Sequence, residues 1–452
     1  MKNDERQGLS RRDFLKRIGM TAGSAAAMMA LEPLSVFGRN DEPKAAPTAG
    51  GMTYRLNRST GDKVSLLGFG MMRLPQKDGQ VDQQLVNRQV RYALEHGVNY
   101  FDTSPHYVRG RPEKSLGTAL RESGFQRKDY YISTKMSNFG GDDDSFDGSV
   151  EMYHRSLEYL QTDYVDYYLL HGVGIGGMEA LRKRFIDNGL LDYIQKEREA
   201  GHIRNLGFSY HDDIKVFDYL LSLNDKYHWD FVQIQMNYLD WKHAKQVNTW
   251  NTNAEYLYTE CEKRGIQNVV MEPLLGGRLA NLPTVYRDRL MARRPNDSIA
   301  SWAFLFVGSH PNILTTLSGM TYMEHLKDNV QTYSPLDPCT TDELVLLEEI
   351  AANVSSNPLI PCTDCRYCMP CPYGVNIPGN FAYYNKNVNE GTLPPDAHDQ
   401  KMKSFREGYR LSLGDKELAT QCVGCKACQP KCPQHIRIPQ QMARLSEMLE
   451  GE

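Results

Sequence analysis

Eight short apolar runs alternate with amphipathic segments along the middle of the chain, between about residues 53 and 335. This alternation predicts repeated strand–helix units. Eight units over roughly 280 residues suit a closed (β/α)8 TIM barrel, whose usual length is about 250 residues. A hairpin is predicted before the first run, at residues 54–64. The predicted strands are residues 65–70, 98–102, 130–135, 165–171, 203–208, 231–235, 266–271 and 313–317, with helical patterns between them, as at residues 83–96, 150–160, 191–200 and 253–264.

Four side chains suited to proton transfer lie near the ends of three neighbouring predicted strands. Asp102, Lys135 and His171 end the second, third and fourth strands, and Tyr107 lies in the loop after Asp102. Chemistry in such a barrel occurs at the carboxyl ends of the strands. Each residue alone can be ordinary, as a capping Asp, a surface Lys or a packed His. Their joint placement on adjacent strand ends predicts an active site.

These segments resemble the aldo/keto reductase family. Residues 101–107 (Phe-Asp-Thr-Ser-Pro-His-Tyr), 132–136 (Ile-Ser-Thr-Lys-Met) and 166–171 (Asp-Tyr-Tyr-Leu-Leu-His) carry the family's Asp, Tyr, Lys and His in order. The resemblance implies that hydride from nicotinamide attacks a carbonyl carbon while Tyr107 protonates the oxygen. We expect the Lys135 ammonium to lower the pKa of this phenol from its usual value of about 10. Asp102 would hold Lys135, and His171 would orient the carbonyl and assist proton movement.

The resemblance also implies a site for the nicotinamide end of a dinucleotide. Ser209, Gln233 and Asn237 match positions that hold the carboxamide of nicotinamide in the family. Met271 stands where the family often places an aromatic ring against the nicotinamide. NAD(P) is therefore the expected cofactor, and a different cofactor in the barrel mouth is the alternative.

The far end of the dinucleotide site departs from the family. The stretch that corresponds to the 2′-phosphate contacts contains Gly319, His325 and Asn329, with Lys327 as its one firm cation and no Arg. A bidentate Arg is the natural partner of a phosphate. The sequence thus argues against a preference for NADP.

Two loops at the predicted barrel mouth are candidates for shaping the substrate pocket. Residues 172–177 match G-x-G-x-x-G after a strand, but the acidic residue that a dinucleotide fold needs does not end a following strand. We therefore interpret this stretch as a flexible loop. Residues 239–252 contain Trp241 and Trp250, which can line a pocket or pack in the core or on the surface.

Eight of the ten cysteines form two groups with two-residue gaps. The second group has the spacing of a bacterial [4Fe–4S] motif, and the first is one residue shorter before its last Cys. Each group ends in Cys-Pro, and both are followed by similar residues, so the two halves form a repeat. This pattern favours two [4Fe–4S] clusters over the alternative, a pair of zinc sites that are each bound by four thiolates. The eight cysteines are Cys362, Cys365, Cys368, Cys371, Cys422, Cys425, Cys428 and Cys432; the remaining two, Cys261 and Cys339, are expected to be unreactive buried thiols.

Residues 336–452 are predicted to form a mainly helical ferredoxin-like domain around these clusters, with a helix near residues 400–409. In two-cluster ferredoxins the fourth Cys of each run serves the other cluster. On that basis Cys432 joins the first three cysteines of the first group, and Cys371 joins the first three of the second. Because iron–sulfur clusters pass single electrons whereas nicotinamide passes hydrides, the alternative of a different cofactor in the barrel mouth stays open.

The N-terminus has the pattern of an export signal. Arg11 and Arg12 lie in Ser-Arg-Arg-Asp-Phe-Leu-Lys, and a weakly apolar run follows at residues 18–30. We interpret residues 1–37 as a twin-arginine signal peptide and residues 38–52 as a linker. The alternative, an accidental Arg pair on a short amphipathic helix, leaves the complete motif unexplained. The protein is therefore expected in the periplasm or cell envelope.

Two functions from different classes remain at this point. The first is an oxidoreductase that interconverts a small-molecule carbonyl and an alcohol, with sugars among the candidates, and exchanges electrons with a redox partner through the clusters. The second is an iron–sulfur electron carrier or docking protein that uses the barrel as a scaffold. The formal net charge of −4 and scattered basic residues give no sign of a nucleic-acid partner. The sequence leaves the oligomeric state open.

Overall fold

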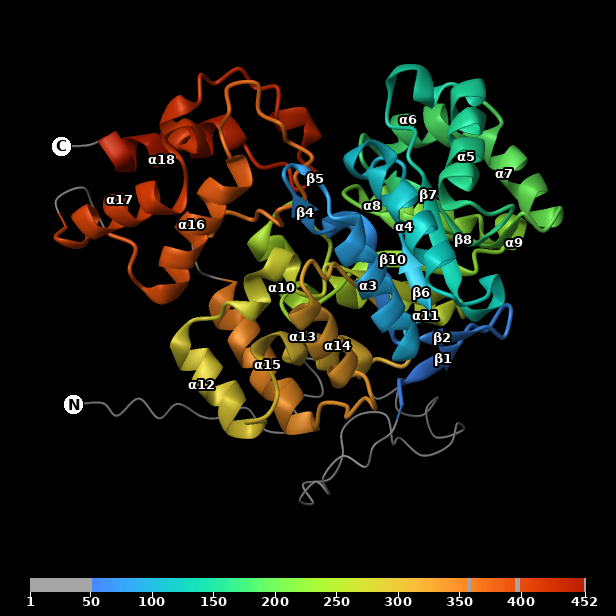
Figure 1. Cartoon of the computed structure of the whole chain (residues 1–452), viewed down its shortest axis with the longest axis horizontal. Coiled ribbons are helices and arrows are strands. Elements are labelled where there is room, and N and C mark those ends of the chain that lie inside the picture. Colours follow the sequence, from blue (N-terminus) through green and yellow to red (C-terminus); the bar gives the residue numbers. More distant parts are fainter. Residues whose placement is uncertain (1–50, 356–358, 395–398, 451–452) are drawn as a thin grey trace.

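Eight parallel strands close into a barrel in which they follow the order β10-β11-β12-β3-β6-β7-β8-β9 (Figure 1). Each predicted strand is present, and the predicted (β/α)8 barrel is confirmed. The strands are β3 (Leu67–Gly70), β6 (Tyr100–Asp102), β7 (Tyr131–Met136), β8 (Val165–Val173), β9 (Ile203–Tyr210), β10 (Phe231–Gln235), β11 (Gln267–Met271) and β12 (Ile313–Ser318).

This computed structural model describes residues 51–355, 359–394 and 399–450. The predicted signal peptide and nearly all of the predicted linker lie outside the described residues. Within them, no helix is both long enough and apolar enough to span a membrane.

Helices alternate with the strands and surround the barrel. Several begin at a side chain that accepts a hydrogen bond from the first turn, as Asp82 does from the Leu85 amide and Ser298 from the Ser301 amide. The helices of this part are α3 (Gln83–Glu95), α4 (Arg111–Glu122), α5 (Phe146–Leu160), α6 (Gly177–Leu181), α7 (Leu190–Glu199), α8 (Ile214–Ser222), α9 (Asn224–Tyr227), α10 (Asp240–Val247), α11 (Ala254–Lys263), α12 (Thr284–Arg293), α13 (Ile299–Gly308), α14 (Met323–Thr332) and α15 (Thr341–Val354).

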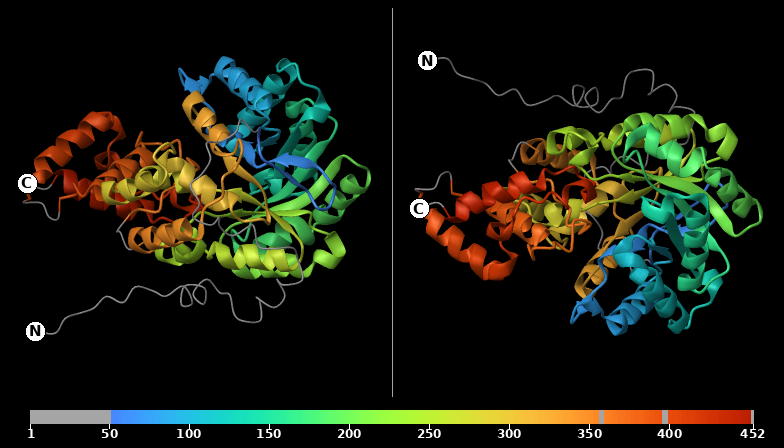
Figure 2. Two further views of the ribbon diagram at one scale, coloured as in Figure 1. Left: turned by 90° about the horizontal axis from the view of Figure 1, so that it is seen from below. Right: turned by 90° about the horizontal axis from the view of Figure 1, so that it is seen from above.

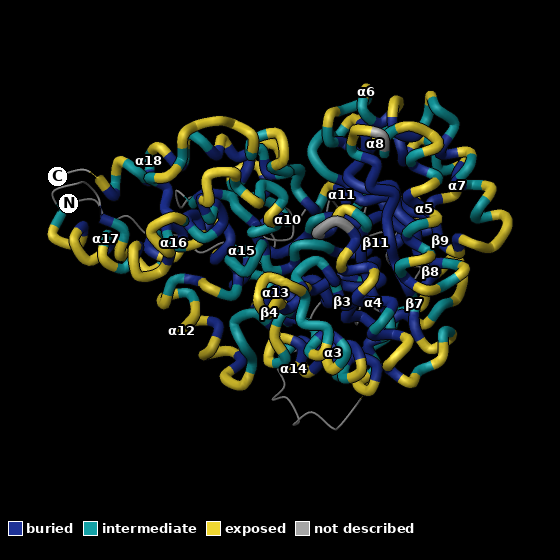
Figure 3. Tube along the Cα trace, turned by 45° about the horizontal axis from the view of Figure 1, so that its top comes forward, coloured by how far each residue is buried: buried dark blue, intermediate teal, exposed yellow. Residues whose placement is uncertain are grey.

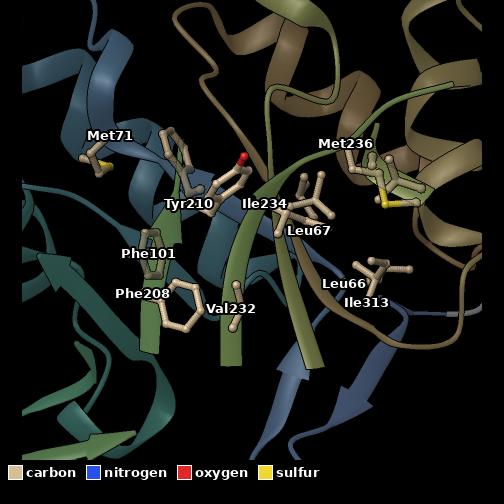
Figure 4. Close-up of a cluster of buried hydrophobic side chains, with 14 of the residues drawn as sticks. Leu66, Leu67, Met71, Phe101, Phe208, Tyr210, Val232, Ile234, Met236 and Ile313 are labelled. Carbon is tan, nitrogen blue, oxygen red and sulfur yellow. The ribbon is translucent and has the colours of Figure 1, made fainter. Parts of the chain in front are cut away.

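Successive side chains of each strand enter two different hydrophobic layers, because strand side chains alternate between faces. In β8, Tyr167 and Leu169 belong to the cluster inside the barrel, whereas Tyr168 and Leu170 belong to the larger cluster under the helices. Figure 3 shows the strands as a buried centre surrounded by more exposed helices. Figure 4 shows part of the outer cluster, which includes the side chains of Phe101 and Phe208.

A hairpin of β1 (Tyr54–Leu56) and β2 (Lys63–Ser65) lies where predicted and covers the amino end of the barrel. The Arg55 guanidinium donates to the backbone carbonyls of Gly308, His310 and Ile313, just before and at the start of β12. A second, very short hairpin, β4 (Gln76–Lys77) with β5 (Gln80–Val81), was not predicted. It belongs to the loop after β3, at the opposite end of the barrel.

Helix α15 packs into the barrel core. Its buried residues Leu346, Leu347 and Ile350 join the hydrophobic cluster of the barrel, whereas the next core cluster begins at Ile360. The hydrophobic core of the barrel therefore continues past the boundary predicted after residue 335.

The C-terminal residues form a mainly helical domain on one side of the barrel, as predicted (Figure 2). Its helices are α16 (Ile377–Glu390), α17 (Lys401–Ser412) and α18 (Ile438–Glu450). They enclose a small core that includes Phe381, Tyr384 and Met442, against which several cysteines pack. A core of this size needs additional cross-links to hold its loops, which metal clusters supply.

The buried Glu113 of α4 predicts a pH dependence of stability. Burial raises the pKa of its carboxyl from 4.5 to about 7, although the Thr134 hydroxyl donates to it at 2.6 Å. The folded state therefore binds this proton more tightly than the unfolded state does. Stability from this group is present below pH 4.5 and is lost as the pH rises through 7, by up to about 3 kcal/mol.

Replacement of Glu113 by Gln should remove this loss, so the free energy of unfolding of the variant should fall less between about pH 5 and pH 8. Urea unfolding of the intact protein at both pH values measures the difference. Glu122→Gln, at an exposed position of the same helix, is the control. Equal pH slopes for the wild type and Glu113→Gln would contradict the assignment.

Candidate active site

The carboxyl ends of β6 and β7 hold a buried ion pair. The Lys135 ammonium donates to Asp102 Oδ1 and, at 2.8 Å, to the backbone carbonyl of Thr103. The Ser133 hydroxyl donates to the other Asp102 oxygen at 3.0 Å. Burial raises the pKa of Asp102 and lowers that of Lys135, while their attraction opposes both shifts. The pair is thereby fixed in one geometry at the bottom of the site.

Tyr107 lies directly above this pair, at the start of a short 3-10 turn (Tyr107–Gly110) after β6. The Lys135 ammonium is 5.1 Å from the centre of its ring. Burial raises the pKa of Tyr107 well above 10, and the nearby Tyr367, Asp102 and Glu272 raise it further. The sequence predicted a lowered pKa for this phenol, because the effects of burial and of the surrounding acidic groups were not visible in it. Tyr107 is therefore a phenol that holds its proton.

His171 at the end of β8 completes the group. Its ring lies edge-on to that of Tyr107, with the centres 5.9 Å apart. Its Nδ1 is 2.6 Å from the Ser137 hydroxyl and 3.3 Å from that of Ser104. Burial lowers the pKa of His171 far below 6.5, and the Lys135 charge adds to this shift. A neutral imidazole with Nδ1 tied to serine hydroxyls leaves Nε2 for a ligand.

The three residues predicted to bind the carboxamide differ in whether their polar atoms already have hydrogen-bond partners. Gln233 is buried, and its Oε1 has no hydrogen-bond partner among the described residues. Ser209 is also buried, and its hydroxyl accepts the Gly172 amide at 2.9 Å. Asn237 donates to Asp240 and Glu272 and accepts from two amides, so its polar atoms are all engaged in holding the loop after β10. Gln233 thus fits an amide ligand, whereas Asn237 has a structural task.

Four of the predicted cofactor residues lie around the ends of β11 and β12. Met271 ends β11 and is partly buried. Gly319 lies under the side chain of Arg73, with any Cβ only 3.2 Å from Arg73 Cδ. Asn329 is buried and donates to Ser318 at 2.9 Å. His325 is exposed and stacks edge-on against Tyr322.

The first cysteine loop covers this part of the barrel mouth. Arg73, after β3, donates to the Thr363 carbonyl and forms an ion pair with Asp364 at 3.4 Å. Gly276, after β11, has φ +67°, and a Cβ built there would lie 2.5 Å from Thr363 Cα. Only glycine permits this approach of two backbones. The cluster-binding loop thus lies directly against the loop that follows β11.

Tyr367, between Cys365 and Cys368, reaches the predicted catalytic residues and was missed by the sequence analysis. Its ring lies edge-on to that of His106 at 5.2 Å, and its phenol is among the groups that raise the pKa of Tyr107. Its own pKa is raised by burial and then by Cys365. The sequence shows only that Tyr367 lies inside the cysteine motif, and this position does not indicate which residues of the barrel it contacts.

A second contact joins the last cysteine motif to the barrel mouth. His435 stacks on Trp250 with ring centres 4.5 Å apart, and its Nε2 is 2.8 Å from Asp212. The Asn248 side chain donates to the Gln434 carbonyl at 2.9 Å. Trp241, in contrast, is partly buried and packs against the barrel core. Of the two tryptophans considered for the substrate pocket, Trp250 therefore contacts the C-terminal domain and Trp241 packs on the barrel core.

The glycine-rich loop after β8 is held by close packing. Strand β8 continues to Val173, which pairs with Tyr210. Gly174 has φ +101°, and a Cβ there would lie 1.8 Å from the carbonyl oxygen of His211. Its glycines therefore allow neighbouring backbones to pack, and the strands on either side of it belong to the closed barrel instead of a dinucleotide fold.

The eight clustered cysteines fall into two sets. Burial raises the pKa of Cys365 to about 12, and Cys432 raises it further. Burial also raises the pKa of Cys368 to about 12, and Cys365, Cys432 and Cys428 raise it further. The Cys428 thiol is influenced by Cys422, Cys425 and Cys371. The lining of one cavity includes Cys371, Cys422, Cys425 and Cys428, together with Cys368 of the first group. Apart from Cys368, which lies near both sets, these groupings are those expected for cross-ligation of two clusters.

The geometry of these thiols differs from that of a site for one ion. Among the described residues, no three His, Cys, Asp or Glu side chains converge closely enough to bind a single metal ion. Ligands at the corners of an iron–sulfur cluster lie farther apart than those of one zinc ion. Buried thiols of raised pKa become thiolates when a metal binds them.

Comparison with known proteins identifies both parts of the chain. A sequence model of the aldo/keto reductase family matches residues 66–352. The chain belongs to the aldo/keto reductase family. A sequence model of the 4Fe-4S dicluster domain matches residues 361–439, which supports the iron–sulfur interpretation of the cysteines over the zinc alternative.

Individual relatives are distant. L-galactose dehydrogenase of Arabidopsis thaliana is 33% identical over 168 residues, which are 36% of this chain and 50% of that protein, so the match spans half the length of that relative. A probable voltage-gated potassium channel subunit beta of the same plant is 23% identical over 69% of this chain and 99% of its own. The holo form of aldo-keto reductase AKR11C1 from Bacillus halodurans has a TM-score of 0.53 and 25% identity, and the alignment covers 66% of this chain and 96% of that one.

The contact between Gly276 and Thr363 predicts that Gly276→Ala weakens docking of the cluster loop on the barrel. The added methyl group would collide with the Thr363 backbone, so amides of residues 359–371 should exchange hydrogen faster by mass spectrometry. Gly277→Ala is the matched control, because Gly277 also has a positive φ (+94°) but nothing lies within 4 Å of its Cβ position. Equal exchange in the two variants would show that this approach does not hold the loop.

Proposed function

We propose that the protein is an oxidoreductase that interconverts a small-molecule carbonyl and an alcohol and exchanges electrons through two [4Fe–4S] clusters. The observation that carries this proposal is the placement of the first cysteine loop on the barrel mouth, with Tyr367 beside Tyr107. Family membership supports the carbonyl chemistry, and the dicluster match supports the electron transfer. The name of L-galactose dehydrogenase favours a sugar as substrate.

In the reducing direction, the catalytic residues bind a carbonyl oxygen and supply it with a proton. Tyr107 holds its proton because it is buried among acidic groups, and it donates this proton as negative charge develops on the substrate oxygen. The Lys135 ammonium, held by Asp102, stabilises the phenolate that remains. The neutral His171 places its ring beside the same oxygen and fixes its direction. The reverse reaction uses the same groups, with the phenolate as base.

A nicotinamide dinucleotide would supply or accept the hydride. The partnerless Gln233 Oε1 fits an amide N–H donor, and Ser209 lies on the neighbouring strand end. We propose that Gln233 and Ser209 bind the carboxamide and that Met271 packs against the ring. The stretch around Gly319, His325 and Asn329 contains no Arg that would bind a 2′-phosphate, so it gives NADP no advantage over NAD.

Electrons enter or leave one at a time through the clusters, whereas a hydride carries two. Two clusters together hold two electrons, one each, which matches a hydride in electron count. A further redox group that exchanges both hydrides and single electrons would be needed to divide the pair and release its proton, and identification of the bound cofactor tests for such a group. A soluble one-electron carrier protein is the class of partner that can exchange them. The cover that the cysteine loop forms over the mouth favours a nicotinamide that stays bound during turnover, as export would require.

The alternative is an electron-transfer protein that keeps the barrel as a scaffold. The cysteine loop favours this alternative in one respect, because it lies across the ends of β11 and β12, between the predicted carboxamide contacts and the predicted far end of the dinucleotide site. Anaerobic purification and identification of the bound cofactor distinguishes the two. A bound nicotinamide supports the enzyme, and its absence together with unresponsive clusters supports the carrier.

Replacement of Tyr107 by Phe should slow carbonyl-dependent reoxidation of the reduced clusters by at least about 100-fold, because the proton donor is lost. The measurement is cluster absorbance after mixing reduced protein with carbonyl compounds, sugars first, under anaerobic conditions. Tyr131→Phe, on the amino half of β7, should leave the rate unchanged. An unchanged rate in Tyr107→Phe would refute the proposed role.

Replacement of Tyr367 by Phe tests whether the cluster domain contributes to the substrate pocket. The ring remains against His106 while the hydroxyl is lost, so we expect a higher KM at nearly constant kcat and an unchanged cluster spectrum. Tyr373→Phe, at a half-exposed tyrosine beside the other cysteine set, is the control. Equal kinetics for wild type and Tyr367→Phe would exclude this hydroxyl from substrate binding.

We also propose export by the twin-arginine route, on the pattern around Arg11 and Arg12. Replacement of both by Lys should retain the protein in the cytoplasmic fraction, because the pathway reads the arginine pair. Cell fractionation and blotting measure this. If the variant with both lysines reached the envelope as well as the wild type does, export would not depend on the arginine pair and the proposed route would be wrong.

A further inference from the structure

One guanidinium at the barrel mouth has no use in the chemistry proposed above. Arg278 lies in the turn Leu275–Ala280 after β11. Its Nε and Nη1 atoms are buried and have no hydrogen-bond partner among the described residues. Removing the N–H groups of a cation from water without giving them a partner is costly. Arg278 as a whole is half-buried, and its two buried, partnerless nitrogens indicate that an anion belongs beside them.

Three groups near Arg278 interact with its charge: Asp240, Cys362 and Tyr238. Asp240 accepts two side-chain hydrogen bonds on Oδ2, each at 2.7 Å, while its Oδ1 bonds neither to Arg278 nor to any other described residue. Asp240 therefore forms neither a hydrogen bond nor a close ion pair with Arg278. Tyr238 is a buried phenol whose pKa is raised by burial, so it stays neutral. Cys362 is the remaining candidate.

The backbone brings Arg278 and Cys362 together. Gly276, two residues before Arg278, approaches the backbone of Thr363, which directly follows Cys362. Cys362 belongs to the set with Cys365 and Cys368, near Cys432. We call this set the proximal set and the set around Cys371, Cys422, Cys425 and Cys428 the distal set. A cluster on the proximal set is an anion, because its four thiolates outweigh the charge of its iron–sulfide core, and reduction adds one more negative charge.

We propose that Arg278 is the barrel's electrostatic partner of the proximal cluster and raises its reduction potential. This inference rests on the proposed electron transfer and extends it. The guanidinium N–H groups would donate to sulfur atoms at the Cys362 corner, and hydrogen bonds to cluster sulfurs are one of the factors that set the potential. The positive charge stabilises the reduced, more negative cluster more than the oxidised one.

The distal set has no comparable cation among the described residues that line its cavity. Cys425 is exposed, and the lysines of that lining, Lys426 and Lys431, are exposed as well. Water screens exposed charges far more than buried ones. The proximal cluster therefore has the higher potential of the two. Electrons taken up at the exposed distal cluster would then move inward, toward Tyr107 and the substrate.

Redox titration of the full chain, followed by EPR under anaerobic conditions with dithionite as reductant, tests this inference. Arg278→Gln shortens the side chain only slightly and removes its charge. We expect the higher of the two potentials to shift to a more negative value while the lower stays in place. Lys426→Gln, at the distal set, should leave the higher potential unchanged. Arg278→Lys, which keeps the charge but loses the planar fork, should give a smaller shift of the same sign.

Iron and sulfide content are measured in parallel. Loss of one cluster in Arg278→Gln supports the proposal if Arg278→Lys retains both clusters with the higher potential lowered. An unshifted higher potential in either variant with both clusters present, or equal shifts of both potentials, overturns it, as does loss of a cluster from both variants.

A dinucleotide phosphate is the other anion that a buried Arg can bind. In that case Arg278→Gln would weaken binding of NADH, measured by fluorescence titration, and leave both potentials unchanged, which overturns the proposal. An unchanged reaction rate in Tyr107→Phe would refute the proposed carbonyl chemistry and leave the potentials untouched. The two failures are therefore distinguishable.

Discussion

The close approach of Gly276 to Thr363 holds the two parts of the molecule in one arrangement. Because neither backbone leaves room for a side chain between them, the cluster-binding loop sits against the barrel mouth in a defined position. The contacts of Arg73 with Thr363 and Asp364, and of Trp250 with His435, follow from that position. So does the presence of Tyr367 beside the catalytic residues. A C-terminal domain attached only by a linker would leave the barrel with an open mouth.

The electrostatics of the site also depend on this contact. Tyr107 keeps its proton because it is buried and because Tyr367, Asp102 and Glu272 surround it. The cation nearest to it, Lys135, is paired with Asp102 and bound to the Thr103 carbonyl, and the phenol stays protonated beside it. In the proposed reaction, such a site would hold a proton until an oxyanion develops on the substrate. It differs from a site that prepares a base in advance.

Local patterns in the sequence were sufficient for the barrel and for the positions of the four catalytic candidates. Strand periodicity sets where each strand ends, and in this fold the strand ends meet at one mouth, so Asp102, Lys135 and His171 could be placed together without a structure. Tyr367 and Arg278 could not be found in this way. Their roles depend on contacts between segments that lie far apart in the chain, about which local spacing says nothing. The direction of the Tyr107 pKa shift was wrong for the same reason, since burial is a property of the assembled site. Helix α15 was assigned to the wrong side of the boundary at residue 335 because its amphipathic pattern does not say which core it joins.

The hairpin that covers the amino end of the barrel has a consequence for biogenesis. Arg55 lies close behind the predicted export signal, yet the carbonyls that it binds belong to Gly308, His310 and Ile313. Until the last strand of the barrel has been synthesised and inserted, these acceptors are not in place, and the hairpin keeps only its contacts with earlier strands, such as those of Asn57 with Tyr167 and Asn205. The hairpin that follows the predicted signal therefore gains its Arg55 contacts only when the barrel is complete. A transport system that admits only finished proteins would find, in this hairpin, a local feature that distinguishes a closed barrel from an open one.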